Sequence, residues 1–558
     1  MDGSQRDFRG VSKGFVLFAA AYLLFTGVAA MLTQVGLPDS AAAVLFTIIT
    51  LAAFATIGIV GRTMYSPAFL MASRSMPPAL NGMAMAGTAI ASAGFLGLAG
   101  TFLVGETAGT AVIAGWTLGF LALAVLVAPF FRKSAAVTVA EFLAIRFGSS
   151  EVRVAAVFVT LVASTILIIA EFAAAGIVME RLLGLSPTTG IVIAAIMVIV
   201  ATLFGGMQGL TLSAIAFYIV MVVAFIVPIA AISLQNYALP LPYFTYGYAL
   251  EDVVALGGET VRYTAGEFLP LGSLDGFNML ILALCLAAGI ASMPHIVMRS
   301  GAAAGLAAAR RSAGWALFFV LIIAAAAPAY AAFARLAVVA DPDVGPIDPG
   351  MLVLDFPAIA GLSSAMTALL AVGALAAILA AASAALFSVA MTIGHDLYAG
   401  LVDPRGPAGR RLIVTRAAIV ATAIFAAFEA TRSGAKSFEL AVTSLSLAAS
   451  GLFPAILLGI WWKRATALGA FAGILAGFVA AAAYVLAVVG GGMEPWRPLG
   501  SAGTGLPAMA AAFFGLPVGF LTMIFVSQLT AEAGNNQDEL VDALRRPSPS
   551  PLLEADRN

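Results

Sequence analysis

The sequence predicts an all-α polytopic membrane protein with about fourteen transmembrane helices. Two observations predict this fold class. First, 62% of the 558 residues are hydrophobic and only 10% are charged, whereas soluble proteins carry about 25% charged residues. Second, the hydrophobic residues gather into runs that are long enough to cross a bilayer, which takes about 20 residues of helix.

The apolar runs are separated by breaks that carry turn residues or charge, such as Gly205-Gly206 and Lys463-Arg464. The first run follows three basic residues and is open to a second interpretation as a signal peptide. Its apolar stretch is longer than the usual core of about 7–15 residues, so we expect a retained helix. The runs lie near residues 15–37, 41–61, 79–104, 110–131, 154–178, 187–204, 210–234, 276–298, 312–336, 363–393, 412–430, 438–461, 465–490 and 506–528.

The distribution of basic residues predicts the orientation of the helices. With the N-terminus placed in the cytoplasm, 21 of the 27 lysines and arginines fall in inside segments and 6 fall outside. Cytoplasmic loops of multi-pass proteins are rich in Lys and Arg. We therefore expect an inner (plasma) membrane protein with both termini in the cytoplasm. We also expect long external loops near 235–275 and 337–362 and a disordered polar tail after Gln528.

The composition argues against several classes of function. A single cysteine, Cys285, excludes an intrachain disulfide framework and a cysteine metal cluster, and two histidines argue against a histidine metal site. The net charge of −1 gives no support to nucleic-acid binding. No hydrophilic stretch is long enough for a catalytic domain, so we expect neither an enzyme nor an organic cofactor. The expected partners are the lipid bilayer and a small-molecule solute.

Two of the predicted spans contain runs of small residues near their centres. The third span contains residues 86–94 and the eighth contains residues 287–294, both rich in Ala, Gly and Ser. Transporters often place interrupted helices at corresponding positions of an inverted repeat, and a separation of five spans would orient these two helices oppositely. Close helix packing also selects small residues, so this pattern alone leaves both explanations open.

Several short motifs occur in a recognisable order. They are Asn81-Gly82-Met83-Ala84-Met85-Ala86-Gly87, Thr138-Val139-Ala140-Glu141-Phe142, Phe204-Gly205-Gly206-Met207, Pro294-His295-Ile296-Val297-Met298-Arg299, His395-Asp396-Leu397-Tyr398 and Gly459-Ile460-Trp461-Trp462. Together they make the chain similar to the sodium:solute symporter family, and within it to the acetate and monocarboxylate permeases, over roughly residues 45–490. The resemblance implies a five-plus-five inverted-repeat transporter core with broken first and sixth core helices.

The resemblance also implies a division of the chain. It comprises an N-terminal segment with two flanking helices (1–78), a first repeat (79–234), an external loop (235–275), a second repeat (276–461), two C-terminal helices (462–528) and a cytoplasmic tail (529–558). In this scheme the Thr138 motif is a loop before the third core helix. The basic residues Arg299, Arg310, Arg311, Lys463 and Arg464 would anchor helix ends at the inner interface, His295 would cap or gate, and Asp396 would cap or pair locally at the cytoplasmic face.

The function implied by the resemblance is secondary active transport of a small organic solute, such as acetate, by alternating access around a midplane site. The half-helix N-termini would hold the carboxylate of the solute. The alternative is a transporter-like sensor or accessory subunit that binds a solute without coupled transport. A small membrane subunit or a homo-oligomer is also compatible with the sequence. Candidate substrate-binding residues are Gly87, Thr88, Ser92, Gly289 and Ser292.

The family's sodium site is only partly matched. By resemblance, Ala86, Ala89 and Ala377 would offer backbone carbonyls, but the two expected hydroxyl positions are Ala380 and Ala381. Thr88 stands where the family usually has an acidic residue, and Ser383 lies one turn further on. Each contact to a charge is worth about 1.5–3 kcal/mol, so we expect weak sodium coupling.

Glu171 lies deep in a predicted core helix, within Leu167-Ile168-Ile169-Ala170-Glu171. Ionisable residues inside a membrane are costly and often mark ion or proton paths. Two interpretations remain open from the sequence. Glu171 is either a neutral side chain bonded to a neighbouring helix or a proton-coupling or substrate-facing group. Na⁺ and H⁺ are therefore the two candidate coupling ions.

Overall fold

The computed structural model is helical throughout its described part. It describes residues 8–36, 66–257, 276–341, 344–434, 436–497, 505–530 and 535–546, with Leu271 and single positions between 38 and 49. Among these residues, β-pairing is limited to one isolated bridge between Met76 and Ala303. Within these described ranges, ten helices are long and apolar enough to cross a membrane, and up to eleven if the bent pair α13–α14 counts as one span. The all-α class is therefore confirmed.

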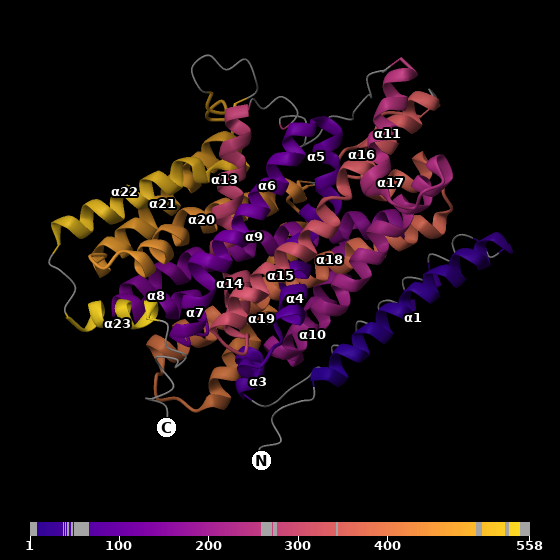
Figure 1. The fold of residues 1–558 in the computed structure, drawn as a ribbon. Coiled ribbons are helices and arrows are strands. Elements are labelled where there is room, and N and C mark those ends of the chain that lie inside the picture. Colours follow the sequence, from indigo (N-terminus) through magenta and orange to yellow (C-terminus); the bar gives the residue numbers. More distant parts are fainter. Residues whose placement is uncertain are drawn as a thin grey trace.

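The predicted count of fourteen helices stays a prediction. Two of the runs correspond to shorter apolar helices, Lys13–Val28 and Pro187–Leu203. The run near 41–61 lies largely outside the described residues. Helix α1 (Phe8–Gln34) lies along one edge of the bundle, where it contacts α10 and α18 (Figure 1).

After α1, the N-terminal half continues with two short helices that precede the longer helices of the bundle. In chain order they are α3 (Ser66–Met71), η1 (Ala72–Arg74), α4 (Pro78–Ser92), η2 (Ala93–Gly97), α5 (Leu98–Val104), α6 (Glu106–Ala122), η3 (Leu123–Val127), α7 (Ala128–Ser134), α8 (Val139–Phe147), α9 (Ser150–Leu183), α10 (Pro187–Tyr237) and α11 (Pro242–Ala255). The Thr138 motif, expected as a loop, thus begins helix α8. Thr138 is its N-cap and accepts a hydrogen bond from the Glu141 N–H at 3.0 Å, which starts the helix.

The C-terminal half completes the bundle and adds a terminal helix. Its helices are α13 (Gly276–Ser292), α14 (Pro294–Gly301), α15 (Leu306–Ala324), α16 (Ala327–Ala340), α17 (Leu352–Ile359), α18 (Ser364–Met391), η4 (Thr392–Val402), α19 (Ala408–Ala430), α20 (Ser437–Trp461), α21 (Ala467–Val489), η5 (Ala508–Ala510), α22 (Ala512–Leu529) and α23 (Asn535–Arg545). The predicted disorder of the tail is wrong for α23. Its apolar side chains Val541 and Leu544 are buried against the bundle.

Three helices are interrupted inside the bundle. Helix α4 breaks at Ala91 (φ 54°, ψ −173°), and α10 breaks at Gly206 (φ 53°, ψ −163°). Helices α13 and α14 meet at Met293 with a bend of 44°. Pro294 favours this break because it has no N–H to continue the ladder of α13. An interrupted helix leaves backbone groups without intrahelical partners, so each break is a place where side chains or ligands can bind.

The helices pack into two sets that meet around α4. Helix α4 packs on α15, and α6 packs on α13, whereas α9 and α10 pack on α18. Helices α20, α21 and α22 lie together on one side of the bundle (Figure 1). Figure 1 also places α3, α7, α8 and α23 at one end and α11, α16 and α17 at the other. The breaks in α4 and between α13 and α14 lie between these ends.

Candidate transport site

The break in α4 is held by a carboxylate from α9. Glu171 is fully buried, and its Oε2 accepts a hydrogen bond from the Ser92 N–H at 3.0 Å. The Ser92 hydroxyl donates to Oε1 at 3.0 Å, and the same N–H lies 3.3 Å from Oε1. Free N–H groups at a helix start favour a negative charge. Glu171 therefore occupies the place at this break where the sequence led us to expect the carboxylate of a solute.

A small cavity lies between the breaks in α4 and α13–α14. Its volume is about 30 Å³, counted over the positions that the centre of a water molecule can take. Because a single water needs about 10–15 Å³ on this measure, the cavity has room for about two. Its polar side chains are Thr88 and His295. The remaining lining is apolar: Ala89, Ile90, Ala91, Ala93, Val112, Trp116, Leu167, Leu286, Ile290, Ile296, Phe438, Ala441, Val442 and Leu445.

A second, smaller cavity lies beside α14 on the side of α10 and α18. It measures about 10 Å³ and is bordered by His295 and Arg299 of α14. Met207 of α10 and Phe387 of α18 form part of its apolar wall. We call this second space the inner cavity. His295 borders both the inner cavity and the cavity between the breaks. His295 is thus the residue that the linings of the two cavities share.

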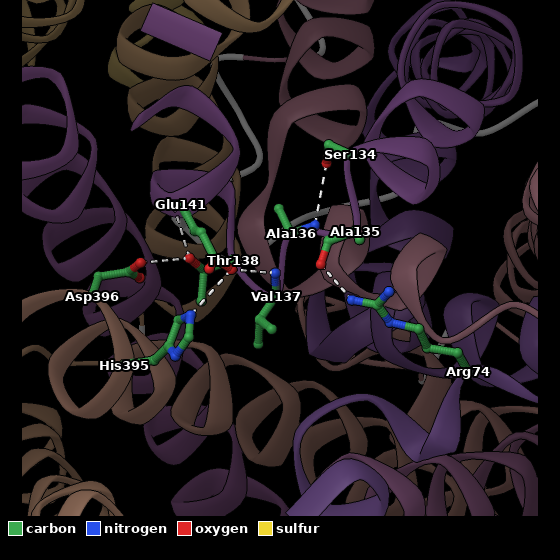
Figure 2. Close-up of polar contacts among 9 residues, drawn as sticks. All are labelled: Arg74, Ser134, Ala135, Ala136, Val137, Thr138, Glu141, His395 and Asp396. Atoms are coloured by element: carbon green, nitrogen blue, oxygen red, sulfur yellow. Dashed lines mark hydrogen bonds and ion pairs between the residues drawn. The ribbon is translucent and has the colours of Figure 1, made fainter. Parts of the chain in front are cut away.

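A cluster of polar side chains joins α8 to η4, the segment that follows α18. His395 Nε2 lies 3.1 Å from Glu141 Oε2, and the Thr138 hydroxyl donates to Asp396 Oδ1 at 2.8 Å (Figure 2). The Val137 N–H also donates to Glu141 Oε2, at 2.6 Å. Asp396 does not pair locally as expected, because its partner Thr138 lies 258 residues earlier in the chain. The cluster fastens two distant segments together at the end of the bundle that carries α7 and α8.

Comparison with known proteins assigns the chain to a family. Residues 69–477 match the model of the sodium:solute symporter family. The chain belongs to this family. It is a multi-pass membrane protein that transports a solute, and it is a symporter rather than an enzyme.

Two relatives align with most of this symporter. An uncharacterised symporter of Cupriavidus necator is 27% identical, over 95% of this chain and 97% of the relative. A monocarboxylic acid transporter of Corynebacterium glutamicum is 26% identical, over 78% of this chain and 81% of the relative. These alignments run across both halves of the chain.

Solved transporters share the fold of the symporter. The substrate-bound, outward-open structure of a Na⁺-coupled sialic acid symporter superposes with a TM-score of 0.69, at 17% identity, over 88% of this chain and 98% of that chain. The closed structure of MHP1, a nucleobase-cation-symport-1 family transporter with bromovinylhydantoin bound, gives a TM-score of 0.50 at 16% identity. It covers 85% of this chain and 98% of that chain. At these identities the likeness concerns the fold alone.

The structure distributes the five expected substrate residues of the symporter over several environments. Thr88 borders the cavity between the breaks, and Ser92 binds Glu171. A side chain at Gly87 would come within 2.9 Å of the Ala214 carbonyl of α10, and one at Gly289 within 2.8 Å of Leu445 Cβ. The Ser292 hydroxyl donates to the Ala288 carbonyl of its own helix at 2.7 Å. Gly87 and Gly289 therefore serve close helix packing in this arrangement.

Apart from Glu171 on α9, the expected ion-site residues lie on α4 and α18, which are in contact. Ala89 borders the cavity between the breaks. Ala86, Ala377, Ala380 and Ala381 are buried and offer only backbone oxygens. The Ser383 hydroxyl is buried and, within the described part of the chain, has no hydrogen-bond partner. It is the one side-chain oxygen of this expected set on α18.

The structure corrects the expected place of Arg299, which was expected to anchor a helix end at the membrane interface. His295 was expected to cap or gate, and that role stays a prediction. Arg299 is 2% exposed and His295 is 4% exposed, and both border cavities inside the protein. Arg146, also near a helix end, is likewise buried and donates to the Gly459 carbonyl at 2.5 Å. The i, i+4 spacing of His295 and Arg299 was the available signal, because it places both on one face of a helix.

Proposed function

We propose that this symporter carries a short monocarboxylate such as acetate by alternating access around the cavity between the breaks in α4 and α13–α14. The size and lining of that cavity carry the proposal. A space of about 30 Å³ favours a solute of a few heavy atoms, and small-molecule sites typically combine apolar walls with a few placed polar groups. The apolar wall suits a methyl or ethyl group, and Thr88 and His295 supply the polar groups.

The similarity to a monocarboxylic acid transporter supports the same substrate class. The position of Glu171 changes how the solute would be held. Since Glu171 already accepts hydrogen bonds from the Ser92 N–H and hydroxyl, the donors at this half-helix start are not free for a second carboxylate. The solute carboxylate would instead face α14, where His295 lies.

A cation coupled to this transport is the second part of the proposal. Two methyl groups, Ala380 and Ala381, replace the hydroxyls that the family resemblance implies for sodium, which favours weak sodium dependence. Glu171 is the proposed proton-coupling group, because it is a carboxylate buried at the helix break beside the cavity. A proton carrier needs a titratable group at the point where the two access routes meet.

Uptake of labelled acetate into proteoliposomes tests the proposal. We expect acetate and propionate to be taken up and to compete with each other, while octanoate competes weakly because the cavity is small. Uptake should respond to a pH gradient and change little when choline replaces sodium at fixed pH. A steep sodium dependence would overturn the proton assignment. Solute binding without any uptake would favour a sensor or accessory subunit instead.

A further inference from the structure

Arg299 is a buried cation whose charge has no acidic partner in the described residues. Its side chain is 2% exposed, and Nη1 donates to the Thr211 hydroxyl at 3.3 Å. Its Nε has no hydrogen-bond partner there, and no described carboxylate pairs with it. The Asn81 amide donates to the Arg299 carbonyl, not to its side chain. An unpaired charge inside a membrane protein is costly, and such residues usually face a cavity or a pathway.

His295 lies one turn earlier on the same face of α14. Its ring meets the backbone of Thr88, and no side chain of the described residues forms a hydrogen bond with it. Buried polar groups in proteins are nearly always satisfied. The Arg299 Nε is such an exception, and it lies beside a cavity that His295 also borders, which indicates that something absent from the protein itself binds there.

The two side chains connect the two cavities. His295 borders the cavity between the breaks and the inner cavity, whereas Arg299 borders only the inner one. A small anion leaving the first cavity would thus pass His295 and then meet the Arg299 guanidinium. Guanidinium groups bind carboxylates through paired hydrogen bonds, and the charge of a carboxylate would compensate the charge of Arg299.

We infer that His295 and Arg299 form an inner binding subsite for the carboxylate of the transported solute, distinct from the cavity between the breaks. This inference rests on the proposed monocarboxylate substrate. The inner cavity, at about 10 Å³, holds about one water molecule in the present conformation. The subsite is therefore occupied when α14 and α18 separate on the inner side. Arg299 receives the anion before it is released to the cytoplasm.

The test compares the two faces of the symporter in proteoliposomes of known orientation. The variants are Arg299→Gln, Arg299→Lys and, as a matched control, Arg310→Gln, which removes an exposed charge at the start of α15. Half-saturation by acetate is measured separately for the cytoplasmic and external faces. Losing a charged hydrogen bond should raise the cytoplasmic half-saturation roughly tenfold to hundredfold in Arg299→Gln. External half-saturation should change less than about twofold, Arg299→Lys should be intermediate, and Arg310→Gln should match the wild type.

Each contrary outcome has a separate meaning. An unchanged cytoplasmic half-saturation in Arg299→Gln overturns the subsite and leaves Arg299 a structural role, while the proposed function stands. If Arg299→Gln does not fold, the half-saturation of Arg299→Lys tests the subsite instead, because lysine retains the charge but lacks the paired N–H donors of the guanidinium group. Thermal stabilisation of the purified wild type by chloride but not by acetate, lost in Arg299→Lys, would assign the site to a halide and overturn the carboxylate. A wild type that neither binds nor carries any monocarboxylate refutes the proposed function itself.

Discussion

Ser92 and Glu171 show how one pair of residues can organise the centre of this symporter. The carboxylate from α9 receives both donors of Ser92, the N–H and the hydroxyl, at the break in α4. A contact of this kind fixes where the second part of the helix begins, because it satisfies a backbone group that the break leaves free. It also ties the set of helices around α4 to the set around α18. Protonation of Glu171 would loosen this tie.

The first prediction concerns Glu171→Gln. A glutamine keeps the shape of the side chain but cannot ionise, and only its carbonyl oxygen can accept from Ser92. We expect the variant to fold with a loss of about 1–3 kcal/mol of stability. We expect it to exchange acetate across the membrane but not to accumulate acetate in response to a pH gradient. Thermal unfolding and paired exchange and accumulation assays in proteoliposomes measure these effects.

Ser92→Ala is the matched control for this prediction. It removes one donor to the carboxylate and leaves the titratable group in place. We expect Ser92→Ala to lose a comparable amount of stability while it still accumulates acetate under a pH gradient. Wild-type accumulation by Glu171→Gln would return Glu171 to a purely structural role at the break.

Residue-level expectations from the sequence succeeded where the signal was local. A glutamate inside an apolar run is visible in the sequence, and so are the small residues around both breaks. The partner of Glu171 was not, because Ser92 lies 79 residues away. Gly87 and Gly289 illustrate the same limit, since a glycine that lines a pocket and one that admits a neighbouring helix look alike in a sequence.

At the scale of single elements, the break in α10 depends on one of two adjacent glycines. Gly206 has φ +53° and ψ −163°, a conformation that strains a residue with a side chain, although Ala91 adopts a similar one at the break in α4. A side chain there would come within 2.5 Å of the Phe69 ring of α3 and 2.8 Å of its Cα. At Gly205 a side chain would meet only the Leu210 nitrogen at 3.5 Å, an ordinary contact. The two positions therefore form a natural pair for comparison.

The second prediction follows from this pair. Gly206→Ala should destabilise the symporter by at least about 1–3 kcal/mol through backbone strain, and the contact with Phe69 adds to that cost. Gly205→Ala should stay close to the wild type. Thermal unfolding of the two purified variants, side by side, measures the difference. Equal stability of the two variants would show that α10 can break at another residue.

The element-level expectations differ in how well they matched the structure. Long apolar runs predicted the major helices because twenty apolar residues have few alternatives in a membrane. Helices α8 and α23 were missed, because their formation depends on contacts with other segments. In α23 only Leu540, Val541 and Leu544 supply large apolar side chains, and without a docking surface such a short helix is marginal in water.

At the scale of the whole molecule, α23 contacts helices from distant parts of the chain. It contacts α7, which packs on α14 and α15, and also α8 and α20, which pack on α9. Arg545 Nε donates to the Ile460 carbonyl at 2.9 Å, and Lys463 Nζ lies 2.7 Å from Asp542 Oδ1. The hydrogen bond from Lys463 holds the pKa of Asp542 below its ordinary value. Asp542 therefore stays ionised at neutral pH, and its contact with Lys463 would weaken only as the pH falls through that lowered pKa.

The last prediction tests both the docking of α23 and the orientation of the symporter. Val541 is fully buried on the face of α23 that packs on the bundle, whereas Glu539 on the same helix is exposed. In a Cys285→Ala background, we expect an impermeant maleimide to label Glu539→Cys quickly in inside-out vesicles and not in right-side-out vesicles. Val541→Cys should label slowly in inside-out vesicles. Adding Asp542→Lys should speed that labelling several-fold, because two like charges would then face each other.

A charge exchange completes the test. Combining Asp542→Lys with Lys463→Asp restores an opposite pair, so the slow labelling of Val541→Cys should return. Fast labelling of Val541→Cys without any charge change would mean that α23 does not pack on the helix bundle when the symporter is in a membrane. Labelling of Glu539→Cys from the external face would overturn the orientation that the excess of basic residues in the predicted inside segments favours. Slow, charge-dependent labelling of Val541→Cys from the cytoplasmic face would instead show that α23 is held against the bundle. Because α23 contacts both α7 and α20, it would then have to move with them or detach when they move apart during the transport cycle.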